Sequence, residues 1–362
     1  MPVPVLKSLE HLYGPNYKDN PYGLGEIRYP RTFIPIDAEA AVKANVISEQ
    51  QRDMAEEAIV LSLDRLGSGM TSSQTMALDI IASSIDQGWK RPCYFAMTVP
   101  TSYYLGLSPY LRNTGMAYQV TPLRGISQSG DIACSTDKMY DNVVNKFRWG
   151  GLDTAKPGSL YLDETVRRMV TTVRSAMLSL AMDLAYEGKA AKTAAEGGQT
   201  VFMGKNAQDY AKDRFDKALK VLDLMMEKLP LKAAPFAIQM GQQTADTYAF
   251  IGSETGNNTA TAKAVKLLED EVMRYADYAR FYQSLSPGQY ERTTNVDRYT
   301  DQRYLPLLIQ DYASLNDKGL DDLMKRIEAR GVNLGRLYSY MKAISPAEEN
   351  EQEPQQEQTT QD

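Results

Sequence analysis

Apolar residues recur every three or four positions over the second half of the chain, as on one face of a helix. The pattern is clearest after residue 160, on Val166, Met169, Val173, Met177, Leu180 and Leu184. Gly188 is expected to end this first helix as a C-cap. A second helix, with Phe215 and Leu222 on its apolar face, is expected to stop at Pro230. The two predict an antiparallel pair.

Helical patterning continues to residue 344. Further helices are expected over 236–251, 260–284, 305–315, 320–329 and 334–344. Pairs of helices, with a proline closing the second, resemble tetratricopeptide repeats, whose period is about 34 residues. The insertion 188–206 lengthens the first turn beyond that pattern. We therefore expect a tetratricopeptide-like helical array over residues 161–344.

The first 125 residues mix shorter patterns. Strands are expected over 28–36, from Cys93 to Val99 as a buried strand, and over 117–123, with helices at 47–63 and 72–85. A small α/β domain is therefore predicted for residues 28–125.

The remaining segments lack such patterns. Residues 1–27 predict an extended lead-in, and residues 126–160 a connection with a short helix around 140–147. The Glu- and Gln-rich tail, residues 345–362, is expected to be disordered. The predicted fold class is α+β and mostly helical: a small mixed α/β domain followed by a tetratricopeptide-like array.

Composition narrows the classes of partner. The net charge of −6 and a pI near 5.2, without a cluster of Lys and Arg, argue against nucleic acid. No stretch reaches the roughly 20 apolar residues that a membrane-spanning helix needs. Nothing at the N-terminus has the pattern of a secretion signal. The chain as written is expected to span no membrane, and export would need an upstream segment.

Residues that carry catalysis are scarce. His11 is the only histidine, so the sequence argues against a histidine-based catalytic triad and against a zinc site with several histidine ligands. Cys93 and Cys134 permit one disulfide, although two buried thiols are the favoured interpretation. Adjacent carboxylates and short glycine runs lack the context of a glycosidase or phosphate site, and indicate solvated surface and turns. We assign no catalytic, cofactor-binding or metal-binding residue.

Tyrosine is abundant, with 23 residues in the chain. The ring combines apolar area with a hydroxyl group, which suits sugar stacking or protein interfaces. Packing between helices is the favoured alternative.

Several segments resemble one known family. They are RTFIPID (31–37), MALDIIASS (76–84), WKRPCYFA (89–96), YYLGLSPYLRNTGMAYQVTPL (103–123), DKMYDNVVNKFRWGG (137–151) and YLDETVRRM (161–169). In content and order they resemble the soluble C-terminal region of Bacteroidetes multi-pass membrane glycosyltransferase-like proteins, which are related to protein O-mannosyltransferases. The family usually has Ile where this chain has Cys93, which implies a packing position.

The resemblance places the catalytic acidic residue in a membrane domain that this chain lacks. It therefore implies a noncatalytic extracytoplasmic module, on the periplasmic side of the inner membrane, that assists acceptor-protein binding or enzyme stability. Its expected partners are the membrane glycosyltransferase domain or the acceptor protein. The alternative is a free-standing scaffold that binds a peptide on its helical array. A soluble enzyme in its own right is the third and least favoured possibility.

The positions that match the family best lie in two short aromatic and basic clusters. Trp89, Arg91 and Tyr94 belong to the first, and Trp149 to the second. They are candidate interaction or folding anchors, with a folding role favoured over ligand contact.

Overall fold

The computed structural model describes residues 2–13, 24–63, 69–125, 127, 132–154 and 161–344. The fold is mostly helical, with small N-terminal mixed sheets followed by a helical array, which confirms the predicted fold class. The chain forms two compact units, one of residues 1–240 with 250–260 and the other of residues 241–249 with 261–362. The predicted disordered tail, 345–362, lies outside the described residues.

The first sheet has the order β1-β2-β3, with β1 Val3–Pro4, β2 Arg31–Pro35 and β3 Ala58–Ser62. β1 runs parallel to β2 and β3 antiparallel to it. Helix α3 (Ser72–Asp86) packs against β2 and α1. Asp37 is the N-cap of helix α2 (Ala38–Lys43), and its Oδ1 accepts a hydrogen bond from the Ala40 backbone N–H at 3.0 Å.

The helix predicted before and across β3 is not present. The expected helix over 47–63 is a 3-10 turn, Glu49–Met54, followed by β3. Ile59 and Leu61 are buried while Val60 is exposed, so the alternation of a strand and pairing with β2 prevail over the helical pattern.

The lead-in also differs from the prediction. It contains β1, the helix α1 (Val5–Leu9) and a 3-10 turn, Glu10–Tyr13. Val5 and Leu9 lie one helical turn apart and are both buried in the core, and this burial orders the segment.

A second sheet has the order β4-β6-β5, from β4 Tyr94–Ala96, β5 Leu111–Asn113 and β6 Ala117–Val120. Short 3-10 turns at Thr101–Tyr103 and Ser108–Tyr110 connect β4 to β5. The strand expected around residues 93–99 is thus only three residues long. It is not buried, because β4 lies at the sheet edge with Tyr94 and Ala96 exposed.

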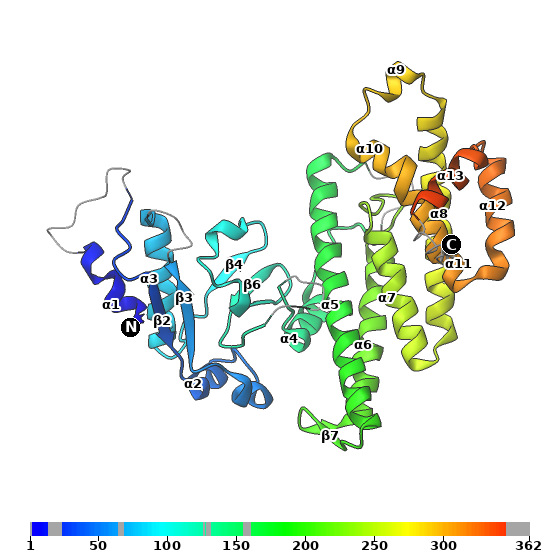
Figure 1. The fold of residues 1–362 in the computed structure, drawn as a ribbon. Coiled ribbons are helices and arrows are strands. Elements are labelled where there is room, and N and C mark those ends of the chain that lie inside the picture. The colour runs from blue at the N-terminus through cyan, green and yellow to red at the C-terminus, as the bar shows by residue number, and fades with distance from the viewer. Residues whose placement is uncertain are drawn as a thin grey trace, which may run out of the picture. The chain divides into compact units, whose positions relative to one another are not determined.

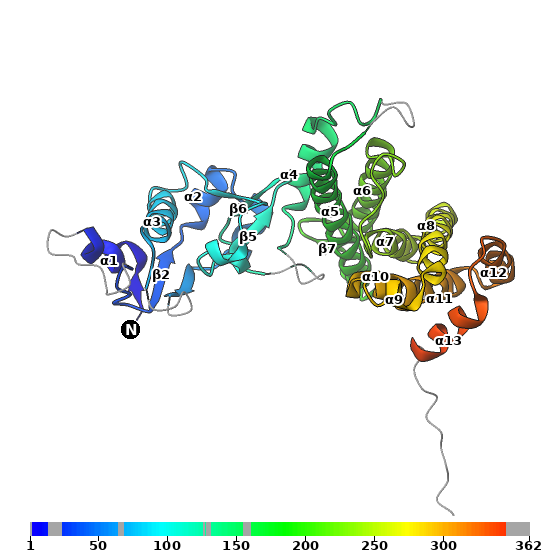
Figure 2. The ribbon, with the colours of Figure 1, turned by 90° about the horizontal axis from the view of Figure 1, so that it is seen from above.

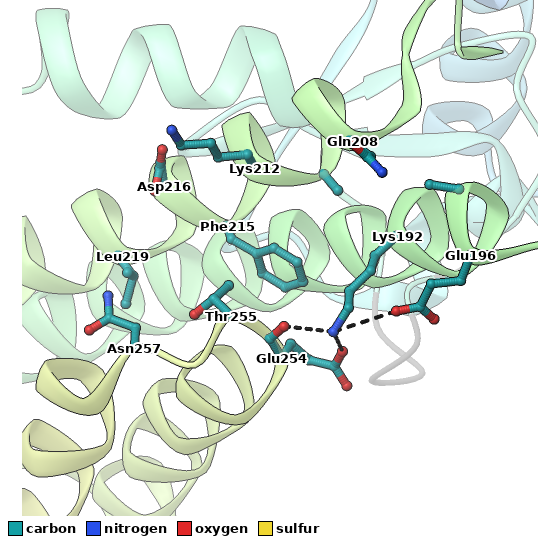
Figure 3. Close-up of a pocket in the computed structure, with 12 residues that line it drawn as sticks. Lys192, Glu196, Gln208, Lys212, Phe215, Asp216, Leu219, Glu254, Thr255 and Asn257 are labelled. Carbon is teal, nitrogen blue, oxygen red and sulfur yellow. Dashed lines mark hydrogen bonds and ion pairs between the residues drawn. The ribbon is translucent and has the colours of Figure 1, made fainter. Parts of the chain in front are cut away.

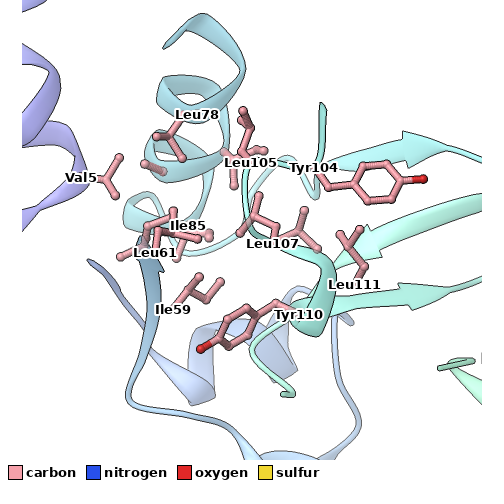
Figure 4. Packing of buried hydrophobic residues seen from close by; sticks show 14 of the residues in the cluster. Val5, Ile59, Leu61, Leu78, Ile85, Tyr104, Leu105, Leu107, Tyr110 and Leu111 are labelled. Atoms are coloured by element: carbon pink, nitrogen blue, oxygen red, sulfur yellow. The ribbon is translucent and has the colours of Figure 1, made fainter. Parts of the chain in front are cut away.

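One hydrophobic core joins the two sheets and α3. It includes Leu78 and Ile85 of α3, Ile59 of β3 and Leu107 before β5, which converge in Figure 4. These side chains come from segments far apart in the sequence, and their removal from water is the main favourable term that holds the α/β part together.

The connection leads into a long helical hairpin. Helix α4 (Thr136–Asp141) continues as a π-helical turn (Asn142–Lys146), near the short helix expected at 140–147. Helices α5 (Glu164–Glu196) and α6 (Ala207–Lys228) then lie side by side, in both Figure 1 and Figure 2, as the predicted antiparallel pair. They are joined by a small β-hairpin, β7 Val201–Phe202 and β8 Lys205–Asn206.

Gly188 does not cap α5, contrary to the prediction, but lies within it and is buried. A Cβ atom there would lie 3.2 Å from the Ala211 carbonyl oxygen and from the Phe215 ring. The glycine therefore lets α5 and α6 approach closely, and the helix continues to Glu196.

The later helices agree well with the sequence pattern. α7 (Met240–Thr255) contributes to both units, and α8 (Asn258–Ser284) leads through the short α9 (Pro287–Tyr290) and α10 (Asn295–Tyr299) and a π-helical turn (Thr300–Tyr304) into the last helices. These are α11 (Leu305–Leu315), α12 (Leu320–Ala329) and α13 (Leu334–Ile344), whose limits match those predicted. The first helix departs from the tetratricopeptide period, because α5 alone has 33 residues against about 34 for a whole repeat.

Candidate functional site

A polar cleft of about 420 Å³ lies where the α/β part, α4 and the α5–α6 pair meet. The loop 45–51 after α2 forms one wall, and α4 forms another. Glu187 of α5, Arg214 of α6 and the β7–β8 hairpin complete the cleft. Pockets at such junctions are common positions for small-molecule sites.

Arg214 is the centre of the ionic network beside this cleft, with only 3% of its side chain exposed. Its Nη2 donates to Asp137 Oδ2 at 2.9 Å, and its Nη1 donates to Asp137 Oδ1. Its Nε lies 3.2 Å from Glu187 Oε2, although the direction is poor for a hydrogen bond. The guanidinium also lies over the Tyr210 ring, 4.4 Å from its centroid. One cation thus connects α4, α5 and α6.

The network changes the protonation of its members. Burial raises the pKa of Glu187, and the Arg214 charge opposes that effect only in part. Hydrogen bonds from Arg214 are the main cause that lowers the pKa of Asp137. Burial would lower the pKa of Arg214, but the hydrogen bond to Asp137 and the Glu187 charge raise it above its usual range. Burial raises the pKa of Tyr210 to about 12, so its hydroxyl stays protonated and donates to Glu187 Oε2 at 3.4 Å.

A second buried carboxylate holds the connecting segment against α5. Asp183 Oδ2 accepts a hydrogen bond from the Cys134 backbone N–H at 2.7 Å, and Asp183 Oδ1 accepts one from the Ser127 hydroxyl. Cys93 and Cys134 are both free thiols, as the favoured interpretation expected, but only Cys134 is buried, while Cys93 is partly exposed. Burial raises the pKa of both thiols, so they are poor nucleophiles at neutral pH.

A larger hollow of about 580 Å³ lies between α5, α6 and the end of α7 (Figure 3). Phe215 points into it, and Ala211 and Leu219 add apolar surface. At its edge, Lys192 Nζ donates to the Glu254 carbonyl oxygen at 2.7 Å and to Glu254 Oε2 at 3.1 Å. The apolar side chains at the bottom of the hollow could contact an apolar group of a ligand, while the charged side chains at its edge could contact polar groups beside it.

The sequence-predicted anchors do not form one site. Trp89 is 1% exposed and lies in the α/β core, in a left-handed backbone conformation with φ of 62°. Arg91 is exposed, and its backbone carbonyl accepts a hydrogen bond from the Ser84 hydroxyl at 2.5 Å. Tyr94 is 50% exposed on β4. Trp149 is partly buried, with its ring centroid 6.0 Å from that of Phe147.

Sequence reasoning missed the polar cleft and its network. A signal existed, because Asp183, Glu187 and Arg214 interrupt the apolar stretches of two predicted helices. Charged side chains in such positions need partners when they are buried. The partners lie in α4 and the connecting segment, which no helical pattern could pair with them.

Two classes of feature are not seen in the described ranges. Within them no group of His, Cys, Asp and Glu is arranged to hold a metal ion. None of the helices that the structure describes has the length and apolar character to cross a membrane.

Part of the chain matches a known family. Residues 27–138, from just before β2 to within α4, match the family described as TMEM260-associated domain 2. This part of the chain is therefore similar to that domain family. TMEM260 is a membrane protein family related to protein O-mannosyltransferases. The matched residues form most of the α/β part, including the Trp89 region and one wall of the polar cleft. No curated protein and no solved structure matches the chain.

Proposed function

We propose that the chain is a noncatalytic extracytoplasmic module of a membrane glycosyltransferase-like protein, acting on the periplasmic side of the inner membrane. It assists binding of the acceptor protein or stabilises the enzyme. The observation that carries the proposal is the TMEM260-associated domain 2 over residues 27–138, because that family includes membrane proteins related to O-mannosyltransferases.

The arrangement of the first unit supports a module of this kind. The α/β part has its own core, and the Asp137–Arg214–Glu187 and Ser127–Asp183 contacts fix α4 and the connecting segment to the helical pair. Such a unit can present the α5–α6 surface to a protein at a fixed position relative to the α/β part. Binding then has a low ordering cost, because the surface is already formed.

The test is glycosyl transfer by the membrane partner with and without this chain. The chain should co-purify with a multi-pass membrane protein and lower the KM for a folded acceptor protein, or raise the thermal stability of the membrane enzyme. The purified chain alone should transfer no sugar. Transfer by the chain alone, or no effect on either quantity, would contradict the proposal.

A second candidate function is a free-standing scaffold for a peptide. The hollow lined by Phe215 and Leu219 favours it, because an apolar floor beside Lys212 and Asp216 suits a peptide side chain with polar neighbours. Leu219→Asp should then abolish binding of a partner that purifies without any membrane protein. Unchanged recovery of that partner by Leu219→Asp would exclude this surface.

A further inference from the structure

The polar cleft contains two lysines that no carboxylate neutralises. Lys138 Nζ donates to the Asn45 carbonyl oxygen at 2.7 Å and to Gln119 Oε1 at 3.0 Å, both uncharged groups. Lys205, on the β7–β8 hairpin, lies near the Tyr210 ring, with 5.9 Å from Nζ to the ring centroid. In the part of the chain that the structure describes, neither ammonium group has an ion-pair partner.

The acidic groups of the cleft are already paired. Asp137 is held by Arg214 and Lys217, Asp141 by Lys146, and Glu187 by Arg214. The lining has four cations, Lys138, Lys146, Lys205 and Arg214, against the three carboxylates, so one positive charge is in excess, and Lys138 and Lys205 are the two cations without a carboxylate partner among the described residues. An ammonium group has three N–H donors and Lys138 uses two of them in the described residues, so one remains for a ligand.

The rest of the lining offers uncharged hydrogen-bonding groups. The side chains of Asn45, Gln50 and Ser135 line the cleft and have no hydrogen-bond partner among the residues described. The Gln51 carboxamide oxygen is occupied by Ser48, which leaves the amide N–H₂ free. Amide and hydroxyl side chains both donate and accept, which matches a sugar hydroxyl, since that group also does both.

The position of Lys205 is set by the hairpin. Met203 (φ 48°) and Gly204 (φ 73°) form its left-handed turn, and Gly204 lies beside Gln50 of the opposite wall. Met203 and Lys205 thereby enter the lining of the cleft. The volume of about 420 Å³ lies at the small end of the range for ligand pockets, roughly 300–1,000 Å³.

We propose that this cleft binds a monosaccharide-sized polyhydroxylated molecule that carries one anionic group. Lys138 and Lys205 neutralise the anion, and Asn45, Gln50, Gln51 and Ser135 bind the hydroxyls. A carboxylate or a phosphate supplies the same charge, so the shared chemistry is an acidic sugar. The proposal does not depend on the proposed function, because it rests on the cleft alone.

The experiment is calorimetric titration of the full chain at low salt with hexuronates and hexose phosphates of the gluco, galacto and manno series. Neutral hexoses and inorganic phosphate serve as references. At least one acidic sugar should bind at least about ten-fold more tightly than both references, which corresponds to about 1.4 kcal/mol. Its affinity should fall as salt rises. Hexuronates and hexose phosphates in separate titrations distinguish the two sources of the anion.

Lys205→Gln should weaken that binding about ten-fold without changing the melting temperature, because Lys205 is exposed. Lys205→Arg should retain it, and Lys212→Gln, an exposed lysine outside this cleft, is the matched control. Lys138→Gln should weaken binding as well, with thermal unfolding recorded to separate loss of fold from loss of affinity. No binding of any acidic sugar, equal binding of neutral hexoses or inorganic phosphate, or an unaffected Lys205→Gln variant would overturn the proposal.

Discussion

Trp89 shows how one side chain can fix a local backbone conformation. It follows Gly88 (φ 72°) and itself has φ of 62°, a region that costs a bulky residue about 1–3 kcal/mol. Its indole Nε1 is buried with no hydrogen-bond partner among the described residues. Burial of the ring in the α/β core has to offset both costs.

Trp89→Ala should therefore destabilise the protein by about 3–5 kcal/mol, because it leaves a cavity of aromatic size. Tyr94→Ala, on the exposed β4 edge, should change the free energy of unfolding by less than about 0.5 kcal/mol. Urea denaturation followed by circular dichroism compares the two. Equal effects would show that Trp89 is not a core residue.

Gly241 makes a similarly close contact in the second unit. A Cβ atom there would lie 2.5 Å from Glu271 Oε2 and 2.7 Å from its Cδ. Glu271 is buried and paired with Arg274, so its carboxylate has little freedom to move. Gly241→Ala should cost about 1–3 kcal/mol. Gly288→Ala, with open space around the new Cβ, should be neutral or slightly stabilising, and thermal melts of both variants test the contrast.

At the scale of elements, Arg214 holds α4 and α5 to α6. Arg214→Gln should lower the free energy of unfolding by about 1–3 kcal/mol, because it leaves the partly buried Glu187 without its cation. The expected loss of stability stays in this modest range because Asp137, the other partner of Arg214, is mostly exposed, and water screens that ion pair. Lys220→Gln, an exposed position on the same helix, is the control. A loss no larger than that of the control would contradict the role assigned to Arg214.

The end of α7 is tied to α5 by Glu254, which accepts from Lys189 Nζ at 2.7 Å and Lys192 Nζ at 3.1 Å. The hydrogen bond from Lys189 is the largest cause that lowers the pKa of Glu254 below its ordinary 4.5. The stability it contributes is present above pH 4.5 and is lost as the pH falls below that value through the lowered pKa.

Glu254→Gln should therefore be less stable than the native chain at pH 7, with the difference shrinking as the pH falls below the ordinary glutamate value. Urea denaturation across that range measures it. Glu328→Gln, an exposed glutamate without an ion pair among the described residues, should show no such pH-dependent difference. A difference in the free energy of unfolding between Glu254→Gln and the native chain that grows as the pH falls would contradict this assignment.

The whole molecule has two compact units, each with its own set of buried residues. Chains of this kind often depart from two-state unfolding. Scanning calorimetry should give a van't Hoff enthalpy below the calorimetric enthalpy, and Trp89→Ala and Gly241→Ala should shift different parts of the transition. A single two-state transition shifted as a whole by either variant would show that the units unfold together.

Much of the fold was predictable because helices need only a local apolar period. The limits of α11, α12 and α13 and the antiparallel α5–α6 pair followed from that period. The segment 47–63 misled the sequence analysis, because its spaced apolar residues fit a helix while pairing with β2 makes its end a strand. The residues that the sequence singled out, Trp89, Arg91, Tyr94 and Trp149, do not line the polar cleft, whose buried charges are paired through contacts between distant segments.

By itself, the sequence determined the mostly helical class, the acidic character and the scarcity of histidine, because these are local or summed properties. Only the tertiary structure decided where Gly188, Arg214 and Lys205 act. From the sequence, Gly188 was expected to end a helix, whereas the structure packs it against α6. Only the structure shows that Asp137 and Glu187 lie beside Arg214. Contacts between residues far apart in the chain depend on packing geometry, which no local pattern contains.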